Sequence, residues 1–352
     1  MSGRRVFILS LYLIISFTEI VSQNNFRVMF YNVENLFDTF DNPVKDDNDF
    51  LPDGFMNWTP WKYRKKLRNI TSVITAVGGM QSPALVGLCE VENDSVMYDL
   101  INRSPLRAQG YEYVMTDSPD IRGINIALLY QRHQFKLLKS TEYVIELGEK
   151  NRRPTRNILH VTGLIINGDT LDVLVCHFPS RSGGQKETEK ARIESAKALR
   201  NRVDSLISKR DTANIIIMGD FNDQPNDKSM SAVLRANCNN IPSDSESSET
   251  KNEKELFNLF RSGEIDNDKG TYKYQGKWYI NDHIIVSGNL LNAKNPIIVK
   301  NSEVNIYAGD FLLEDDLKYY GKKPFRTNMG PRYNDGFSDH LPIYMDLIIN
   351  AP

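Results

Sequence analysis

One short run constrains the fold of this chain more than any other. Residues 215–218 are all apolar, and Gly219 and Asp220 end the run. An apolar run of this length, rich in β-branched residues, is typical of a strand buried on both faces. Asp220 and Asn222 are two positions apart, so on an extended chain their side chains would point to the same side. The pair predicts either a polar site at the end of a strand or an Asx turn with no further role.

The composition is that of an ordinary globular protein. The 352 residues are 40% hydrophobic and 25% charged, which is enough for a sizeable core. A net charge of −2 disfavours tight non-specific binding to long nucleic acid. Cys89 and Cys176 lie in apolar runs where we expect them to be buried, and with Cys238 they form neither a disulfide framework nor a metal motif.

The N-terminus has the layout of a secretory signal peptide. Arg4 and Arg5 precede an apolar run over 6–15. The alternative is a membrane anchor, but the run is shorter than the ~20 residues needed to span a bilayer. We therefore predict a signal peptide over 1–22, a single catalytic domain over 23–352, export to the periplasm or medium, and no stable membrane span.

Alternation, helical spacing and turn residues predict a series of strands with three helices among them. A helix should begin at Pro60 after the N-cap Thr59. The Asn167-Gly168 pair predicts a hairpin turn. Further strands are expected over 26–31, 84–89, 112–115, 124–130, 158–166, 170–178, 284–286 and 343–349, helices over 60–78, 97–102 and 186–209, loops over 38–58 and 310–336, and a mobile polar insertion over 239–254.

Polar residues recur where an apolar run meets a loop. If these strand ends meet at one edge of stacked sheets, their side chains would form a pocket of carboxylates, amides and imidazoles. Hard oxygen ligands of this kind suit Mg²⁺, Mn²⁺ or Ca²⁺ better than a soft metal. The residues are Asn32, Glu90, His177, Asp220, Asn222, Asp282, Asp339 and His340.

Six stretches around these residues resemble, in order, the motifs of the endonuclease/exonuclease/phosphatase superfamily of metal-dependent phosphohydrolases. The resemblance runs from about residue 26 to residue 349, and it implies a four-layer α/β sandwich of two packed mixed β-sheets flanked by helices. The stretches are FYNVEN (30–35), LCEVEN (88–93), CHFPS (176–180), MGDFND (218–223), NDHIIVS (281–287) and SDHLPI (338–343).

By matching motif positions, the resemblance implies a metal site for Mg²⁺ or Mn²⁺. Glu90 would be its central carboxylate, and Asn32 and Asp339 would complete or steady it. Each has a plainer alternative: a helix cap for Glu90 and turn formation for Asn32 and Asp339.

The resemblance also implies the catalytic residues. Asp220 would take a proton from the attacking water or orient it, and Asn222 would hold that water or a phosphate oxygen. His340 would donate to a non-bridging phosphate oxygen, with Asp282 fixing its tautomer and favouring its charged form. His177 would contact the phosphate from the opposite wall; its alternative is a hydrogen-bonded histidine at the edge of the core.

The chain departs from the family pattern at two arginines. Ser180 and Arg181 stand where a polar amide is common, which leaves Arg181 to supply charge to the phosphate. Arg156 begins a strand that faces the site in some members, and we expect it to be solvated rather than catalytic.

The predicted function is hydrolysis of a phosphodiester, possibly in DNA or RNA, by an exported monomeric enzyme. A phosphatase or lipid phosphodiesterase of the same superfamily is the alternative within enzymes. A binding module that kept the fold without turnover is the alternative outside them.

Overall fold

The computed structural model describes residues 26–148, 153–239, 241, 253–261 and 269–350. The predicted signal peptide over 1–22 and most of the predicted insertion over 239–254 lie outside these residues. Within the part of the chain that is described, no helix combines the length and the apolar character needed to cross a membrane.

Two seven-stranded mixed sheets form the centre of the molecule. The first has the order β14-β20-β1-β2-β4-β3, with β15 also paired to β20, and the second has the order β5-β6-β7-β8-β13-β10-β9. The strands of the first are β1 (Phe26–Leu36), β2 (Leu85–Val91), β3 (Tyr111–Met115), β4 (Asn125–Gln131), β14 (Ile297–Val299), β15 (Asn305–Ile306) and β20 (Ile343–Ile349). Those of the second are β5 (Phe135–Tyr143), β6 (Ile158–Ile165), β7 (Thr170–His177), β8 (Ile215–Asp220), β9 (Ala236–Asn237), β10 (Leu256–Asn258) and β13 (Asp282–Ser287).

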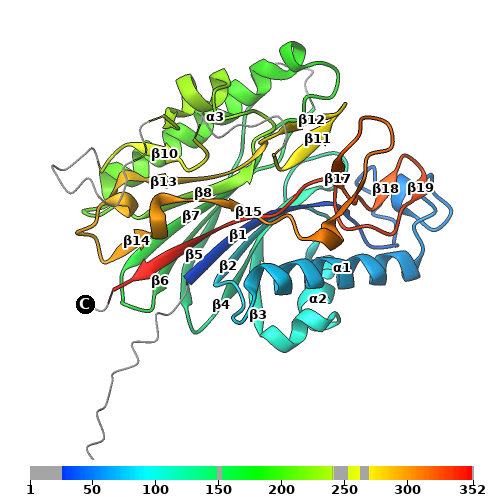
Figure 1. Cartoon of the computed structure of the whole chain (residues 1–352), viewed down its shortest axis with the longest axis horizontal. Helices are drawn as coiled ribbons and strands as arrows, with labels where there is room; N and C mark the ends of the chain where they lie inside the picture. Colours follow the sequence, from blue (N-terminus) through cyan, green and yellow to red (C-terminus); the bar gives the residue numbers. More distant parts are fainter. Residues whose placement is uncertain (1–25, 149–152, 240, 242–252, 262–268, 351–352) are drawn as a thin grey trace, which may run out of the picture.

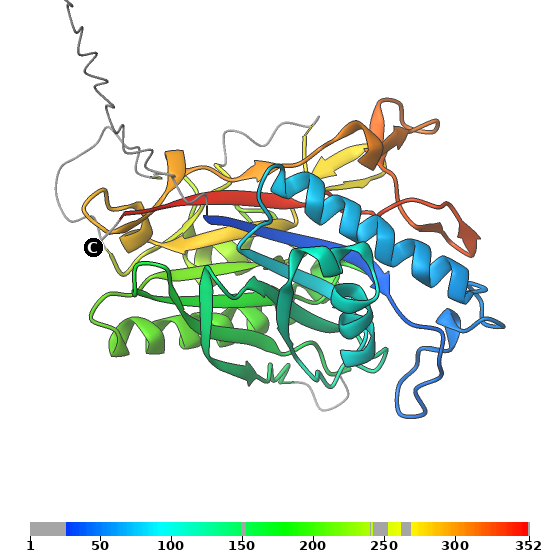
Figure 2. The ribbon, with the colours of Figure 1, turned by 90° about the horizontal axis from the view of Figure 1, so that it is seen from below.

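Helices cover the outer face of each sheet. Figure 1 shows α3 (Gln185–Lys209) on the side of the second sheet, with α1 (Pro60–Gly78) and α2 (Asp94–Asn102) on the side of the first. Figure 2 shows α1 lying over the first sheet. The predicted four-layer α/β sandwich is therefore confirmed.

Three apolar clusters follow this layering. One contains residues of both sheets, including Phe30 and Met218, and fills the space between them. The other two lie under α1 and α2 and under α3. Gly87 of β2 allows the two sheets to approach, because a Cβ there would be 2.7 Å from the sulfur of Met218 and 3.1 Å from the Phe30 ring.

Local sequence explains where the helices begin. Thr59 accepts a hydrogen bond from the Lys62 N–H, and Asn93 accepts one from the Val96 N–H, so each satisfies a donor left over in the first turn. The cap at Asn93 begins α2 three residues earlier than predicted. Shorter helical turns occupy Asn48–Phe50, Pro105–Gln109, Ser229–Leu234, Gly288–Leu291, Lys300–Ser302 and Asp310–Leu312.

Apolar periodicity missed strand β5, which has one solvent-facing side, and several small hairpins. The predicted loop over 310–336 is wrong in part, since it contains two of these hairpins. Their strands are too short to show a period, and long-range hydrogen bonds hold them to the core. The hairpins are β11–β12 (Tyr272–Tyr274, Lys277–Tyr279), β16–β17 (Leu313–Asp315, Lys322–Pro324) and β18–β19 (Asn328–Met329, Arg332–Tyr333).

Candidate active site

Strand pairing brings six of the eight predicted site residues to one edge of the two sheets. In the second sheet, β7 and β8 are parallel with His177 opposite Asp220, and antiparallel β13 begins with Asp282, also opposite Asp220. In the first sheet, β1 and β2 are parallel and carry Asn32 and Glu90 near their ends. His340 lies three residues before the start of β20.

The segment before β20 is tied directly to β1. The Ser338 hydroxyl donates to the Asn32 carbonyl at 2.7 Å, and the His340 N–H donates to the Ser338 oxygen at 3.1 Å. His340 therefore lies beside Asn32 although 308 positions separate them in the sequence.

Asp220 is the centre of the site. Its Oδ2 accepts a hydrogen bond from the Asn32 amide at 3.1 Å, and it lies 3.6 Å from Nε2 of His177 and 3.8 Å from Nε2 of His340. Its side chain is 2% exposed. Burial penalises the charged form of Asp220 and raises its pKa to about 7. The positive charge of His340 lowers this pKa, whereas the negative charges of Asp282 and Glu90 raise it.

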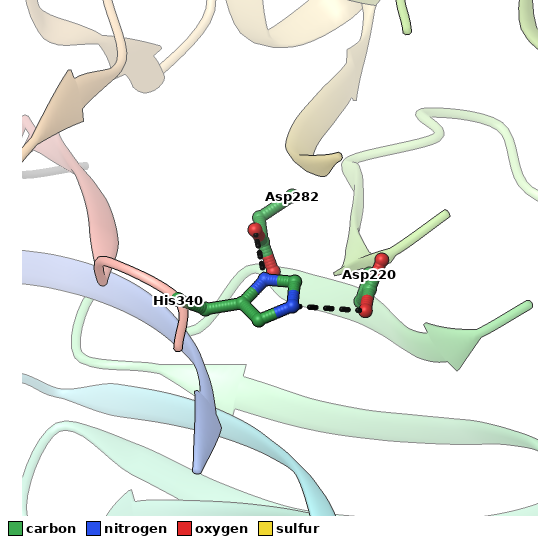
Figure 3. A group of neighbouring side chains, drawn as sticks. All are labelled: Asp220, Asp282 and His340. Atoms are coloured by element: carbon green, nitrogen blue, oxygen red, sulfur yellow. Dashed lines mark hydrogen bonds and ion pairs between the residues drawn. The ribbon is translucent and has the colours of Figure 1, made fainter. Parts of the chain in front are cut away.

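His340 lies between two carboxylates (Figure 3). Its Nδ1 donates to Asp282 at 2.7 Å, and its Nε2 faces Asp220. Although burial lowers it, the charges of these two carboxylates raise the pKa of His340 well above its usual value. The ring of Tyr272, 4.9 Å away between centroids, packs against the imidazole. The two carboxylates thus favour the charged form of His340.

His177 has the opposite electrostatic setting. Burial lowers its pKa well below its usual value, and the positive charge of Arg156 lowers it further. The expectation that Arg156 is solvated is wrong. Its side chain is 6% exposed and donates to the Phe178 carbonyl at 2.6 Å and to Asp120 at 3.4 Å. Arg156 is therefore buried next to the strand end that carries His177, and its charge disfavours protonation of His177.

Asn222 does not share a strand face with Asp220, because β8 ends at Asp220 and Asn222 has a left-handed backbone at φ 51°. Its N–H donates to Asp220 at 2.9 Å, and its side-chain amide donates to the Phe178 carbonyl at 3.1 Å. Arg181 does not offer a spare charge to a phosphate. Its guanidinium pairs with Asp223 and Asp227 and donates to the Asn222 carbonyl.

Glu90 turns out of its strand at a bulge. The pairing of β2 with β4 slips between Cys89 and Val91, and Glu90 has φ 64°. Its carboxylate accepts hydrogen bonds from the Asn35 N–H at 2.9 Å and the Asn32 amide at 3.2 Å and remains 18% exposed. The Asn32 oxygen accepts the Glu34 N–H at 3.0 Å, so Asn32 presents donors to Glu90 and Asp220.

Asp339 belongs to a second acidic group that the motif analysis did not recognise. Arg326 donates to Asp339 at 3.1 Å and to Glu34 at 3.0 and 2.8 Å. The sequence could have indicated Glu34, since it lies two residues after Asn32 in the FYNVEN motif (30–35). Arg326 and Tyr272 come from hairpin segments without a recognisable pattern.

Among the described residues, one group of side chains has ligand atoms close enough together to hold a metal ion. Atoms of Asp220, Asp282 and His340 lie within 4.8 Å of one another. In this set Nδ1 of His340 is already hydrogen-bonded to Asp282, so only Nε2, which faces Asp220, is left as a nitrogen ligand.

Three further carboxylates, those of Glu90, Glu34 and Asp339, lie near the buried Lys66, on which all three act electrostatically, and their donor type suits a hard cation. Carboxylate oxygens are the donors that such a cation binds. Glu90 and Asp339 are partly exposed, and the Glu34–Asp339 pair already binds a positive group, the Arg326 guanidinium.

Comparison with solved structures finds proteins that share this fold over most of the chain. The chain is similar to a mannosyl-6-phosphatase, Bt3783, from Bacteroides thetaiotaomicron, with 16% identity, a TM-score of 0.53, and 92% and 99% of the two chains covered. It is similar to a humanized D. rerio TDP2, with 17% identity, a TM-score of 0.54, and 92% of this chain and 98% of that chain covered. It is also similar to the human Nocturnin catalytic domain, with 18% identity, a TM-score of 0.53, and 93% of this chain and 95% of that chain covered. At these identities the likeness shows the fold alone.

No curated protein matches the chain. The sequence profile of the Endonuclease/Exonuclease/phosphatase family matches residues 27–348, which is nearly all of the chain that carries the six motifs. Members of this superfamily are phosphoester hydrolases that depend on divalent metals. The chain therefore belongs to the endonuclease/exonuclease/phosphatase family.

Proposed function

We propose that this protein is a phosphodiesterase that depends on Mg²⁺ or Mn²⁺. The observation that carries the proposal is the surroundings of Asp220, whose Oδ2 lies within 3.8 Å of the side chains of Asn32, His177 and His340. A carboxylate with a pKa of about 7 is suited to accept a proton from water at neutral pH. The protonated His340 beside it is suited to bind an anionic oxygen.

In this proposal each residue has one task. Asp220 accepts the proton of the attacking water, and Asn222, through its N–H to Asp220, keeps that carboxylate oriented. His340 donates its Nε2 proton to a non-bridging phosphate oxygen, while Asp282 holds its Nδ1. A cation held by Glu90 would neutralise the substrate's charge and stabilise the developing oxyanion.

The substrate we favour is a phosphodiester, with DNA and RNA as the first polymers to test. Phosphomonoester hydrolysis is the second candidate, because the chain shares its fold over 92% of its length with a protein described as a mannosyl-6-phosphatase. A lipid phosphodiesterase is a further alternative within the same chemistry.

The test is release of p-nitrophenol from bis(p-nitrophenyl) phosphate, with p-nitrophenyl phosphate as the monoester, in Mg²⁺ or Mn²⁺ and again with chelator. We expect metal-dependent release from the diester and its loss in Glu90→Gln. Glu189→Gln, an exposed glutamate of α3, is the matched control. Release from the monoester alone would favour the phosphatase. No metal-dependent release from either compound would favour a binding module.

We also propose that the protein is exported. The arginine pair followed by the apolar run over 6–15 supports this. Fractionation of expressing bacteria should recover the protein outside the cytoplasm with its N-terminal residues removed. Recovery of the full-length chain in the cytoplasm would contradict the proposal.

A further inference from the structure

Arg326 is a cation held between two carboxylates at the edge of the site. Its Nε and Nη2 donate to Oε1 of Glu34 at 3.0 and 2.8 Å, and Nη2 also donates to Oδ2 of Asp339 at 3.1 Å. Glu34 is 3% exposed and Asp339 21%, whereas the Arg326 side chain is 38% exposed. The guanidinium therefore covers the solvent side of an otherwise enclosed acidic pair.

The backbone that carries Arg326 is fixed independently of its side chain. The neighbouring Thr327 donates its N–H to Oε2 of Glu34 at 2.8 Å. The buried Lys66 of α1 donates to the Thr327 hydroxyl and, at 2.6 Å, to the Phe337 carbonyl. A Cβ on Gly336 would lie 2.2 Å from the carbonyl oxygen of Phe325. These contacts hold the base of the β18–β19 hairpin (Figure 1) without using the Arg326 side chain.

Charge balance explains why a cation is needed here. Two enclosed carboxylates side by side repel each other, and each loses solvation by burial. Two cations offset this repulsion: the Arg326 guanidinium, which donates hydrogen bonds to both carboxylates, and the buried Lys66, whose charge also acts on both. A divalent cation at the Glu34 and Asp339 oxygens would attract both carboxylates more strongly than one guanidinium does and would repel that guanidinium.

We propose that Arg326 is a resident counterion of the Glu34–Asp339 pair that leaves when a divalent cation binds, and then binds the phosphate of the substrate. The proposal rests on the metal-dependent function proposed above. An arginine fork matches a phosphate as well as it matches a carboxylate. The Glu34 and Asp339 carboxylates would thus be paired with Arg326 before the metal binds and with the metal afterwards. Arg326 would contact the phosphate only after the metal is bound.

The test is metal affinity in the absence of substrate. Isothermal titration of Mn²⁺ into wild-type and Arg326→Gln protein should show tighter binding in the variant by about tenfold, because no internal cation competes. Arg332→Gln, an exposed arginine of the same hairpin, is the matched control and should bind as the wild type does. The metal-free Arg326→Gln protein should also melt at a lower temperature than the wild type and gain more from Mn²⁺.

A second measurement follows the released side chain. Arg326→Gln should raise the KM for bis(p-nitrophenyl) phosphate more than it lowers kcat, because the phosphate contact is lost. Mn²⁺ binding that is equal or weaker in Arg326→Gln overturns the proposal and leaves the proposed function intact. If wild-type protein binds no Mn²⁺, or binds it equally well in Glu90→Gln, the proposed metal site itself is wrong.

Discussion

At the scale of single residues, the site depends on backbone conformations that side chains rarely adopt. Glu34, Asn35, Glu90 and Asn222 all have φ between 51° and 64°. A left-handed conformation costs a residue other than glycine roughly 1–3 kcal/mol and persists where surrounding contacts enforce it. Here the Asn35 N–H donates to the Glu90 carboxylate, so two such residues hold each other in place. The strain turns the carboxylates out of their strands toward the site.

His340→Ala should reduce kcat/KM for a phosphodiester by roughly 10²-fold or more, a loss typical of removing one oxyanion donor. The fold should survive, because the His340 N–H still donates to Ser338. Steady-state kinetics with circular dichroism check both points. His133→Ala removes an exposed histidine and is the control. Wild-type turnover by His340→Ala would exclude the assigned role.

The pH dependence of activity should identify Asp282 as the group that keeps His340 protonated. Asp282 raises the pKa of His340 by its charge and its hydrogen bond. In Asp282→Asn that pKa falls, so activity should decline on the alkaline side at a lower pH than in the wild type. A kcat/KM profile measures the shift. An alkaline limb that does not move would mean that another group titrates there.

At the scale of elements, the sequence predicted the three long helices and most of the long strands, with the nine-residue β5 as an exception, because apolar runs and periods mark their buried faces. The same reasoning predicted that six polar residues lie at one edge of the sheets. Strand register explains this, because it sets His177 and Asp282 opposite Asp220. It failed for Asn222, because an argument from alternation ends where β8 ends, at Asp220. It also missed Tyr272 and Arg326, which reach the site from short hairpins held by contacts distant in the sequence.

Gly219→Ala should damage both stability and activity. A Cβ at Gly219 would lie 2.3 Å from the Cys176 carbonyl oxygen, a backbone atom that cannot rotate away. The strands β7 and β8 would have to separate next to Asp220, with a cost of about 1–3 kcal/mol or more. Gly168→Ala at the β6–β7 turn has a strained φ of 87° but open space, and serves as comparison. Denaturant unfolding measures both; a larger loss in Gly168→Ala would contradict this account of the packing.

At the scale of the whole molecule, the active site is where the two sheets meet the solvent. Asn32, Glu90 and His340 come from the first sheet, and the second contributes the residues that face them. Packing the sheets together therefore forces acidic groups into one partly buried volume. Glu90 and Asp282 both raise the pKa of Asp220, after burial itself. The acidic groups that the site needs for its chemistry thus lower the stability of the folded protein.

Asp220→Asn should therefore stabilise the metal-free protein at alkaline pH while abolishing activity. The folded-state pKa of Asp220 is about 7, against about 3.9 for an unfolded aspartate. The stability that the protonated carboxyl contributes is present at acid pH and is lost as pH rises through about 7. With chelator at pH above this value, the variant should exceed the wild type in free energy of unfolding by on the order of 4 kcal/mol, and the two should converge in acid. Asp211→Asn, at an exposed position, should change neither value. The expected gain in stability comes from removing one of several acidic charges that the two sheet edges bring together. An Asp220→Asn protein less stable than the wild type at alkaline pH would contradict this. It would show that the Asp220 charge is already balanced within the metal-free site.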